Sequence, residues 1–417
     1  MATKALKPLF ASLLAASFLT VSGVAPAAVS FLGEGNIPGT ATDGSGLTDI
    51  LEDGVTPHNQ VGGLGSAFAY TGRGDLYVAT PDRGPADGTT SYIDRLYTLR
   101  VAVAESGGIW TVTPTLESTR LLRTGTDYFT GSAAAHDAAN SAASLRFDPE
   151  GVRVDGCGRS IFVSDEYGPF VYQFDMNSGK RLAAVPVPNK YLIDVPANVP
   201  GDELALNKAG RQANRGMEGL AISPDGTRLF GIMQSPLIQD GGLDTALARV
   251  GTNTRILEMN LATGEYKEYL YKLESKSYGI SEILAVNDHE FLVLERDGKA
   301  GSSAVFKKLF KIDVSAASDI RTLQAMDVTA TPAGVTPVAK VEFLDFLNPA
   351  YGLAGSSFPE KMEGIAFGPD LPDGRHLLIA TNDNDFLAAN ANRFFAFAID
   401  GADLPGFQAQ QIARCPR

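Results

Sequence analysis

The chain has 417 residues, of which 44% are hydrophobic and 20% charged, and it contains 44 glycines and 23 prolines. This composition is typical of a turn-rich globular protein that is long enough to bury a large core. Its formal net charge of -13 argues against binding to nucleic-acid or membrane phosphates, because so acidic a surface repels them. We therefore expect that the protein binds no nucleic acid and does not insert into a membrane. We also expect a monomer.

The first 27 residues have the pattern of a signal peptide. Lys4 and Lys7 form a basic start, residues 9–21 are apolar, and residues 25–27 (Ala-Pro-Ala) form a small-residue cleavage site. The apolar run is too short to span a bilayer securely, and no later stretch approaches the required length. We predict a periplasmic or extracellular protein.

A short pattern then recurs along the chain. Its clearest copy, residues 215–226, has Glu218 and Gly219 at a corner, an apolar strand and an Asp-Gly turn, and a second apolar strand follows. The glutamates of four copies are Glu150, Glu218, Glu282 and Glu363. The copy at Glu282 lacks the glycine, and a first copy near residues 62–79 lacks the acid. We expect the glycine to supply a φ that bulkier residues do not adopt. Repeated hairpins predict a β-propeller or a β-solenoid.

The intervals between copies hold further strands, for example residues 170–175 and 255–261. Each unit thus has about four strands, which is the content of one propeller blade. We predict a single all-β domain, a propeller over residues 61–417, preceded by a lead-in over residues 28–60 with one edge strand near residues 28–32. Five blades can be read, and six or seven would also fit the length. Residues 124–144 and 316–337 are predicted as loops.

Equivalent positions on the innermost strands of a propeller converge at one mouth of its central channel. The register above therefore predicts a ring formed by Glu150, Glu218, Glu282 and Glu363. Carboxylates so close together raise each other's pKa and require cations, and their oxygens suit a hard divalent ion such as Ca²⁺. The alternative is that each glutamate only accepts backbone N–H bonds at its corner.

A second polar set follows the returning strands, at the next loop along the chain. Its members, which we predict as catalytic, are Asp82, Arg83, Asp165, Glu166, Glu295 and Arg296, and an Asn/Asp cluster at residues 382–385 occupies the corresponding place. Acids there would hold a metal that polarises a phosphoryl oxygen and activates water, and the arginines would neutralise charge. The alternative is a solvated rim with weak ion pairs.

The two cysteines, Cys157 and Cys415, are candidates for a disulfide in an oxidising compartment, and two free thiols are the alternative. Several other chemistries lack their sequence signals. The chain has no Gly-x-Ser-x-Gly elbow, no Walker A motif and no Cys-x₅-Arg phosphate loop, and its four histidines lack metal-binding spacing.

Longer stretches carry a family resemblance: residues 147–151, 161–169, 216–220, 291–297 and 382–386. Together with the corners at Glu282 and Glu363, they resemble the "esterase-like activity of phytase" family of secreted bacterial proteins over nearly the whole mature chain. The resemblance implies a β-propeller and a phosphoesterase or phosphodiesterase activity on a small-molecule phosphate ester. It attributes that activity to recurrent acids, which here match Glu150, Asp165, Glu166, Glu218, Glu282, Glu295 and Glu363. The first blade departs from the pattern, because residues 62–66 contain no acid.

Two other functions also fit the sequence. A non-catalytic propeller could bind a ligand or a protein partner and use Ca²⁺ only for structure. A lactonase or carboxylesterase could use the same scaffold, because a central Ca²⁺ can polarise a carbonyl as well.

Overall fold

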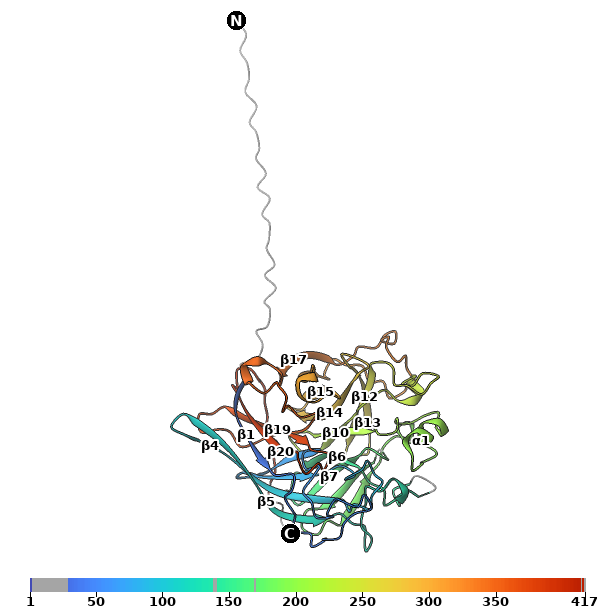
Figure 1. The fold of residues 1–417 in the computed structure, drawn as a ribbon. Helices are drawn as coiled ribbons and strands as arrows, with labels where there is room; N and C mark the ends of the chain where they lie inside the picture. Colours follow the sequence, from blue (N-terminus) through green and yellow to red (C-terminus); the bar gives the residue numbers. More distant parts are fainter. Residues whose placement is uncertain (2–28, 138–140, 169, 414, 416–417) are drawn as a thin grey trace.

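The computed structural model describes residue 1 and residues 29–137, 141–168, 170–413 and 415. The predicted signal peptide and its cleavage site lie outside these residues, apart from Met1. Within the described ranges the strands form five four-stranded antiparallel sheets arranged in a ring (Figure 1). The innermost strands of neighbouring sheets contact one another all the way round, from β2 (Ala67–Arg73) to β18 (Lys361–Phe367) and back to β2. The fold is therefore a five-bladed β-propeller, as predicted.

Four of the blades are built from consecutive strands, innermost first. The first is β2, β3 (Leu76–Thr80), β4 (Arg95–Ser106) and β5 (Ile109–Leu121). The second is β6 (Pro149–Val154), β7 (Ser160–Asp165), β8 (Val171–Asp175) and β9 (Arg181–Val185). The third is β10 (Met217–Ile222), β11 (Arg228–Met233), β12 (Asn253–Asn260) and β13 (Tyr266–Lys272). The fourth is β14 (Tyr278–Ala285), β15 (Glu290–Asp297), β16 (Lys307–Asp313) and β17 (Ala339–Asp345).

The fifth blade joins the two ends of the chain. Its inner strands are β18, β19 (His376–Asp383) and β20 (Asn392–Ile399), and its outermost strand is β1 (Val29–Ile37), which pairs antiparallel with β20. Residues 29–37 therefore belong to the propeller itself, whereas the sequence placed them in a lead-in. This pairing closes the ring through backbone hydrogen bonds and covers an edge that β20 would otherwise expose.

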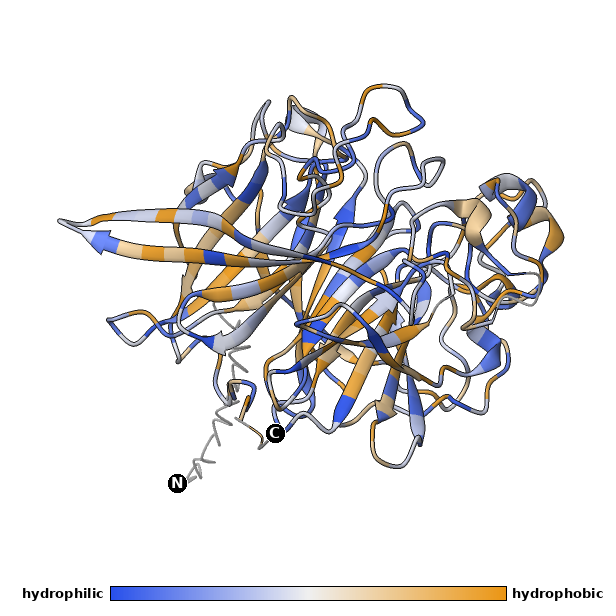
Figure 2. Cartoon of the chain, turned by 90° about the horizontal axis from the view of Figure 1, so that it is seen from below, coloured by the Kyte–Doolittle hydropathy of each residue, from blue (hydrophilic) through white to orange (hydrophobic). Residues whose placement is uncertain are grey.

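The core lies between the blades, where five apolar clusters fill the five interfaces. On β20, Phe395 and Phe397 pack towards the fourth blade, whereas Phe394 and Ala396 pack towards the first. The alternation follows from the two-residue period of a strand, and both faces of β20 are buried. Figure 2 shows the apolar residues concentrated along the strands, with hydrophilic residues towards loops and strand ends.

Helical structure is scarce in the described ranges. In the sequence, the α-helix α1 (Pro200–Leu206) comes between the second and third blades. The remaining helical turns are 3₁₀: Ala133–Ala135, Asn189–Tyr191, Ile238–Asp240, Gly301–Ser303 and Pro349–Tyr351. No helix in the described part of the chain has the length and apolar character needed to cross a membrane. The hairpin of β4 and β5 projects beyond the other strands (Figures 1 and 2).

The C-terminal tail crosses one end of the propeller. The backbone N–H groups of Gln408, Gln411 and Ala413 donate to carbonyls in the hairpin turns of the fourth, third and second blades, at 2.7–2.8 Å. A disulfide joins Cys157, in the turn of the second blade, to Cys415, 258 residues later. The tail thus closes the end of the channel opposite to the mouth where the glutamate corners lie.

A charged cavity at one mouth of the propeller

The glutamate corners are β-bulges on the innermost strands. On β6, Pro149 pairs with Asp165 and Gly151 with Ser164, so Glu150 between them has no partner. Glu218 is bulged in the same way on β10, and Glu363 lies in the equivalent irregularity on β18. A bulge re-aims the extra residue away from the ladder, here towards the channel mouth.

The glycine after each corner is required by close packing of the inner strands. A Cβ at Gly219 would lie 2.7 Å from the backbone nitrogen of Ile283, and one at Gly151 would lie 2.6 Å from that of Leu220. Neither glycine has a positive φ, so the expectation of an unusual φ was wrong. The glycines instead let neighbouring blades approach around the channel.

The fourth blade has a different register from the one that the sequence suggested. On β14, Ile280 pairs with Glu295 and Glu282 with Leu294, so the bulged residue is Ser281. Glu282 therefore does not join the ring at the mouth. Its carboxylate lies 3.0 Å from the Arg153 guanidinium and accepts backbone N–H bonds from Leu220 and Ile283.

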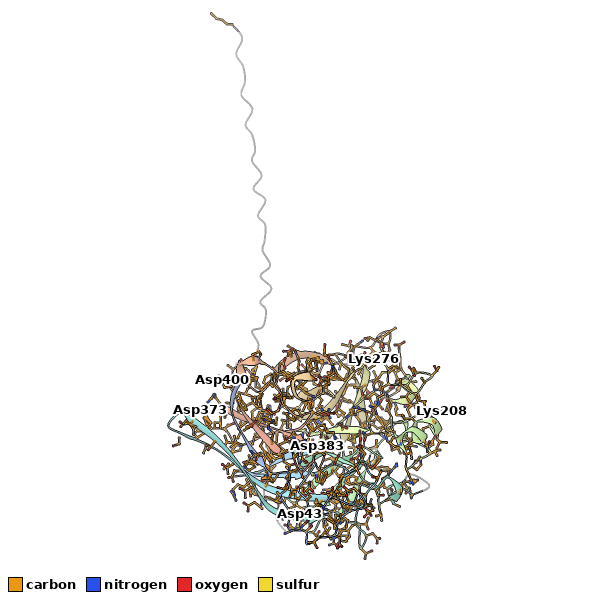
Figure 3. The ribbon with its side chains drawn as sticks, in the orientation of Figure 1. Asp43, Lys208, Lys276, Asp373, Asp383 and Asp400 are labelled. Atoms are coloured by element: carbon orange, nitrogen blue, oxygen red, sulfur yellow. A yellow bond between two sulfur atoms is a disulfide. The ribbon has the colours of Figure 1, made fainter. Side chains whose placement is uncertain are left out.

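The bulges open onto a cavity of about 580 Å³. Asp383, in its lining, lies near the middle of the molecule, whereas Asp373 and Asp400 lie towards the edge (Figure 3). The carboxylates that line it are Asp82, Asp87, Glu150, Glu166, Glu218, Glu360, Glu363, Asp383 and Asp385. The basic residues that line it are Arg83, Arg215, Arg249, Lys276, Arg296 and Lys361. With all of them ionised, the lining carries three more negative than positive charges.

Three of the acids could hold a cation. Carboxylate oxygens of Asp148, Glu150 and Glu166 lie within 4.8 Å of one another, and all three side chains are buried. Arg83 is the cation beside them, 2.5 Å from Asp148 and 3.2 Å from Glu166. One guanidinium against three carboxylates leaves two negative charges, which a divalent ion with a preference for oxygen ligands would balance.

Glu150 has the fewest hydrogen-bond partners of the three acids. It is 7% exposed, and no hydrogen-bond donor in the described ranges reaches its carboxylate. Burial raises its pKa, and the nearby carboxylates of Glu218 and Asp148 raise it further. Burial likewise raises the pKa of Asp148, to about 6. A buried acid among other acids favours either a proton or a metal ion.

The other acids of the cavity have local partners. Glu363 lies 2.7 Å from Arg296, and Asp383 lies 2.7 Å from Lys361. Gln234 donates to one oxygen of Glu218, and the other oxygen is buried without a partner. Burial raises the pKa of Glu218, and so do its neighbours Glu166 and Glu363.

Asp82 belongs to the same cavity. Its carboxylate accepts the backbone N–H of Gly84 at 3.0 Å. Burial raises its pKa, and the carboxylate of Asp383 raises it further.

Two predicted catalytic acids lie outside the cavity lining. Asp165 accepts the backbone N–H groups of Asp148, Tyr167 and Gly168 at 2.7–3.0 Å, so it organises the turn after β7. Glu295 lies 2.7 Å from Lys340 and accepts from the Tyr271 hydroxyl at 3.0 Å.

The remaining predicted residues do converge on the cavity: Asp82, Arg83, Glu150, Glu166, Glu218, Arg296 and Glu363. Sequence reasoning missed several others there. Lys361 lines the cavity, and Asp148 belongs to the acidic cluster behind its lining. Each lies two residues before a corner glutamate, a spacing that could have found them. Arg249 and Lys276 come from loops that carry no repeat signal.

The family described as "esterase-like activity of phytase" (Phytase-like) matches residues 59–386, which is most of the chain and includes every residue of the acidic cluster. The chain belongs to this phytase-like family. An "uncharacterized secreted protein" from Arthroderma benhamiae is 28% identical over 304 residues. The match covers 58% of this chain and 58% of that relative, so the phytase-like chain spans little more than half of the relative's length.

Solved structures resemble the phytase-like propeller only weakly. A glutaminyl cyclase from Myxococcus xanthus has a TM-score of 0.38 at 10% identity, with coverage of 89% of this chain and 97% of that one. A hydrazine synthase from Kuenenia stuttgartiensis has a TM-score of 0.33 at 12% identity, with coverage of 76% and 64%. Similarities of this size carry no argument about activity.

Proposed function

We propose that this phytase-like propeller is a secreted, metal-dependent hydrolase of phosphate esters whose site is the charged cavity. The observation that carries the proposal is the carboxylate of Glu150, which is buried among acids without a donor of its own. Membership of the phytase-like family supports an esterase-like activity. The predicted signal peptide and the description of the fungal relative as secreted support export.

Asp148, Glu150 and Glu166 would hold the cation, and we propose Ca²⁺ because carboxylate oxygens suit it. A bound divalent ion supplies polarisation of a phosphoryl oxygen and a more acidic water. Arg83 holds two of the three ligands in place through its bonds to Asp148 and Glu166. The charge left over after Arg83 fits a divalent ion better than a monovalent one.

Glu218 is the group that we propose for proton transfer. Burial and neighbouring acids raise its pKa above the usual range of a carboxyl group, and a raised pKa suits a carboxyl group that donates a proton and takes it back. Gln234 fixes one of its oxygens, and the unpartnered oxygen remains free for a ligand. Asp82 and Arg296, from the predicted catalytic set, line the same cavity and would contact the rest of the substrate.

The test combines metal analysis of the purified mature protein with hydrolysis of p-nitrophenyl phosphate and its bis-ester, with Ca²⁺ or with EDTA. Glu150→Gln and Glu218→Gln should abolish metal-dependent turnover. Glu342→Gln, on the exposed strand β17, is the matched control and should retain it. Bound metal and higher thermal stability without turnover would support a non-catalytic binding propeller. Turnover of carboxylic esters or lactones alone would place the chemistry at a carbonyl. A purified protein that binds no metal would contradict the proposal.

A further inference from the structure

The basic side chains of the cavity fall into two groups. Arg83, Arg296 and Lys361 each form ion pairs with carboxylates of the lining or of the acidic cluster. Arg215, Arg249 and Lys276 line the same cavity, but none of them has a carboxylate within salt-bridge distance in the described ranges. Arg215 is half-buried, so its charge is only partly hydrated and an anion would stabilise it, whereas Arg249 and Lys276 are exposed.

The two unpaired arginines come from two loops at the same end of the third blade. Arg215 lies two residues before β10 and follows Asn214, a non-glycine residue with a φ of 54°. Arg249 precedes β12 and makes one long hydrogen bond, at 3.4 Å, to the carbonyl of Ala213. The Nε of Arg215 is buried without a partner. Both guanidinium groups therefore keep most of their donors free.

The position of Arg215 is fixed next to the acidic cluster. The neighbouring Gly216 packs so tightly on Glu166 that a Cβ there would lie 2.1 Å from the Glu166 carbonyl oxygen. The backbone N–H of Gly216 also donates to the Glu166 carboxylate at 3.3 Å. On its other side Arg215 lies against Gly279, where a Cβ would come within 3.1 Å of Nη1. A group bound by the Arg215 guanidinium would therefore lie near Gly279, within electrostatic reach of Glu218 and Glu166.

Arg215 and Arg249 also repel one another. Burial, and after it the positive charge of Arg249, lower the pKa of Arg215 to about 10, although the carboxylates of Glu218 and Glu166 act in the opposite direction. An anion that contacts both would offset this repulsion. Guanidinium groups present planar pairs of donors that match phosphate oxygens, so two of them can contact three oxygens of one phosphate group.

We propose that Arg215 and Arg249 form a subsite for the dianionic phosphate group of a phosphomonoester, with Lys276 at its outer edge. The choice of phosphate as the anion rests on the proposed function, whereas the presence of an anion site does not. Two guanidiniums match two negative charges and three free oxygens, which a monoester offers. A diester has one charge and two free oxygens, so it would satisfy the subsite less well. The bound monoester would lie within electrostatic reach of Glu166, one of the proposed metal ligands.

Equilibrium binding of inorganic phosphate, measured by calorimetry with Ca²⁺ or with EDTA, tests the subsite without any turnover. Arg249→Gln is the main variant, because this exposed side chain contributes little to folding. Arg215→Gln is the second, checked by its thermal unfolding. Each should weaken phosphate binding about tenfold or more, as expected for the loss of charged hydrogen bonds. Arg100→Gln, an exposed arginine on β4 paired with Asp75 and Glu117, should leave it unchanged.

Methyl phosphate and dimethyl phosphate then distinguish the two ester classes. Methyl phosphate should bind about as well as inorganic phosphate, and dimethyl phosphate about tenfold more weakly. Equal phosphate binding by wild type and Arg249→Gln, or no binding by wild type in either condition, would overturn the subsite. Equal binding of both esters would overturn its preference for monoesters. Arginine-dependent binding without hydrolysis would keep the subsite and reject the hydrolase.

Discussion

The guanidinium of Arg153, on the innermost strand of the second blade, lies 3.0 Å from the carboxylate of Glu282, on the innermost strand of the fourth. Arg153 also donates to the carbonyls of Phe68 and Ile283, in the first and fourth blades. Glu282 accepts the backbone N–H of Leu220, in the third. The pair thus links four of the five inner strands across the channel, on the side of the cavity that faces the C-terminal tail.

Replacement of Arg153 by methionine should destabilise the propeller by about 3–5 kcal/mol, because Glu282 is left as a buried acid without its countercharge. The free energy of unfolding in urea at neutral pH measures the loss. Glu342→Gln, which breaks an exposed pair with Lys308, should cost less than about 1 kcal/mol. An effect of Arg153→Met as small as this control would mean that the pair across the channel does not hold the blades.

The pH dependence of stability should reveal Glu282 directly. Burial raises its pKa to about 7, above the unfolded value of about 4.3. Between these values the folded state keeps a proton that the unfolded state has lost, so the contribution of Glu282 to stability falls as the pH rises. The stability of wild type relative to Glu282→Gln should decrease from pH 5 to pH 7, by at most about 1.4 kcal/mol per pH unit. Urea unfolding of both proteins at several pH values measures it, and a constant difference would contradict the raised pKa.

The register of the fourth blade predicts which glutamates affect metal binding. Glu218→Gln should lower the affinity for Ca²⁺ about tenfold, because Glu218 lies beside the proposed ligands. Glu282→Gln should leave that affinity unchanged, because its carboxylate pairs with Arg153 outside the cavity. Titration with Ca²⁺ followed by calorimetry compares the two. Equal losses of Ca²⁺ affinity in the two variants would instead support a metal site formed by all four glutamates.

The disulfide should stabilise the tail more than the blades. Cys157→Ser opens a loop of 258 residues and should cost about 2–5 kcal/mol in the free energy of unfolding. Limited proteolysis should then cut near residues 403–413 faster than elsewhere, because the described tail is otherwise held to the blade turns by a few hydrogen bonds, three of them between backbone groups. Cleavage within a blade as the first event would instead show that the bridge stabilises the whole ring.

Much of the fold was predictable because its repeating hairpins follow patterns of residues that are close together in the sequence. Corner, strand, Asp-Gly turn and strand recur in the second, third and fifth blades, and each needs only residues close in sequence. The pairing of β1 with β20 was not predictable, since it joins residues more than 350 positions apart and β1 has no copy of the repeat. The local sequence predicted only a five-residue edge strand, at residues 28–32.

The sequence by itself determined an all-β chain of hairpin repeats and placed acids at the strand corners, because turn residues and alternating apolar residues act over a few positions. Only the tertiary structure decided which acids share a cavity. A one-residue difference in the bulge of β14 presents Ser281 to the cavity and sends Glu282 to Arg153, since successive residues of a strand face opposite sides. The structure also brought Arg215 and Arg249 together from separate loops, because the antiparallel order β10–β11–β12 places the start of β10 and the loop before β12 at the same end of the third blade.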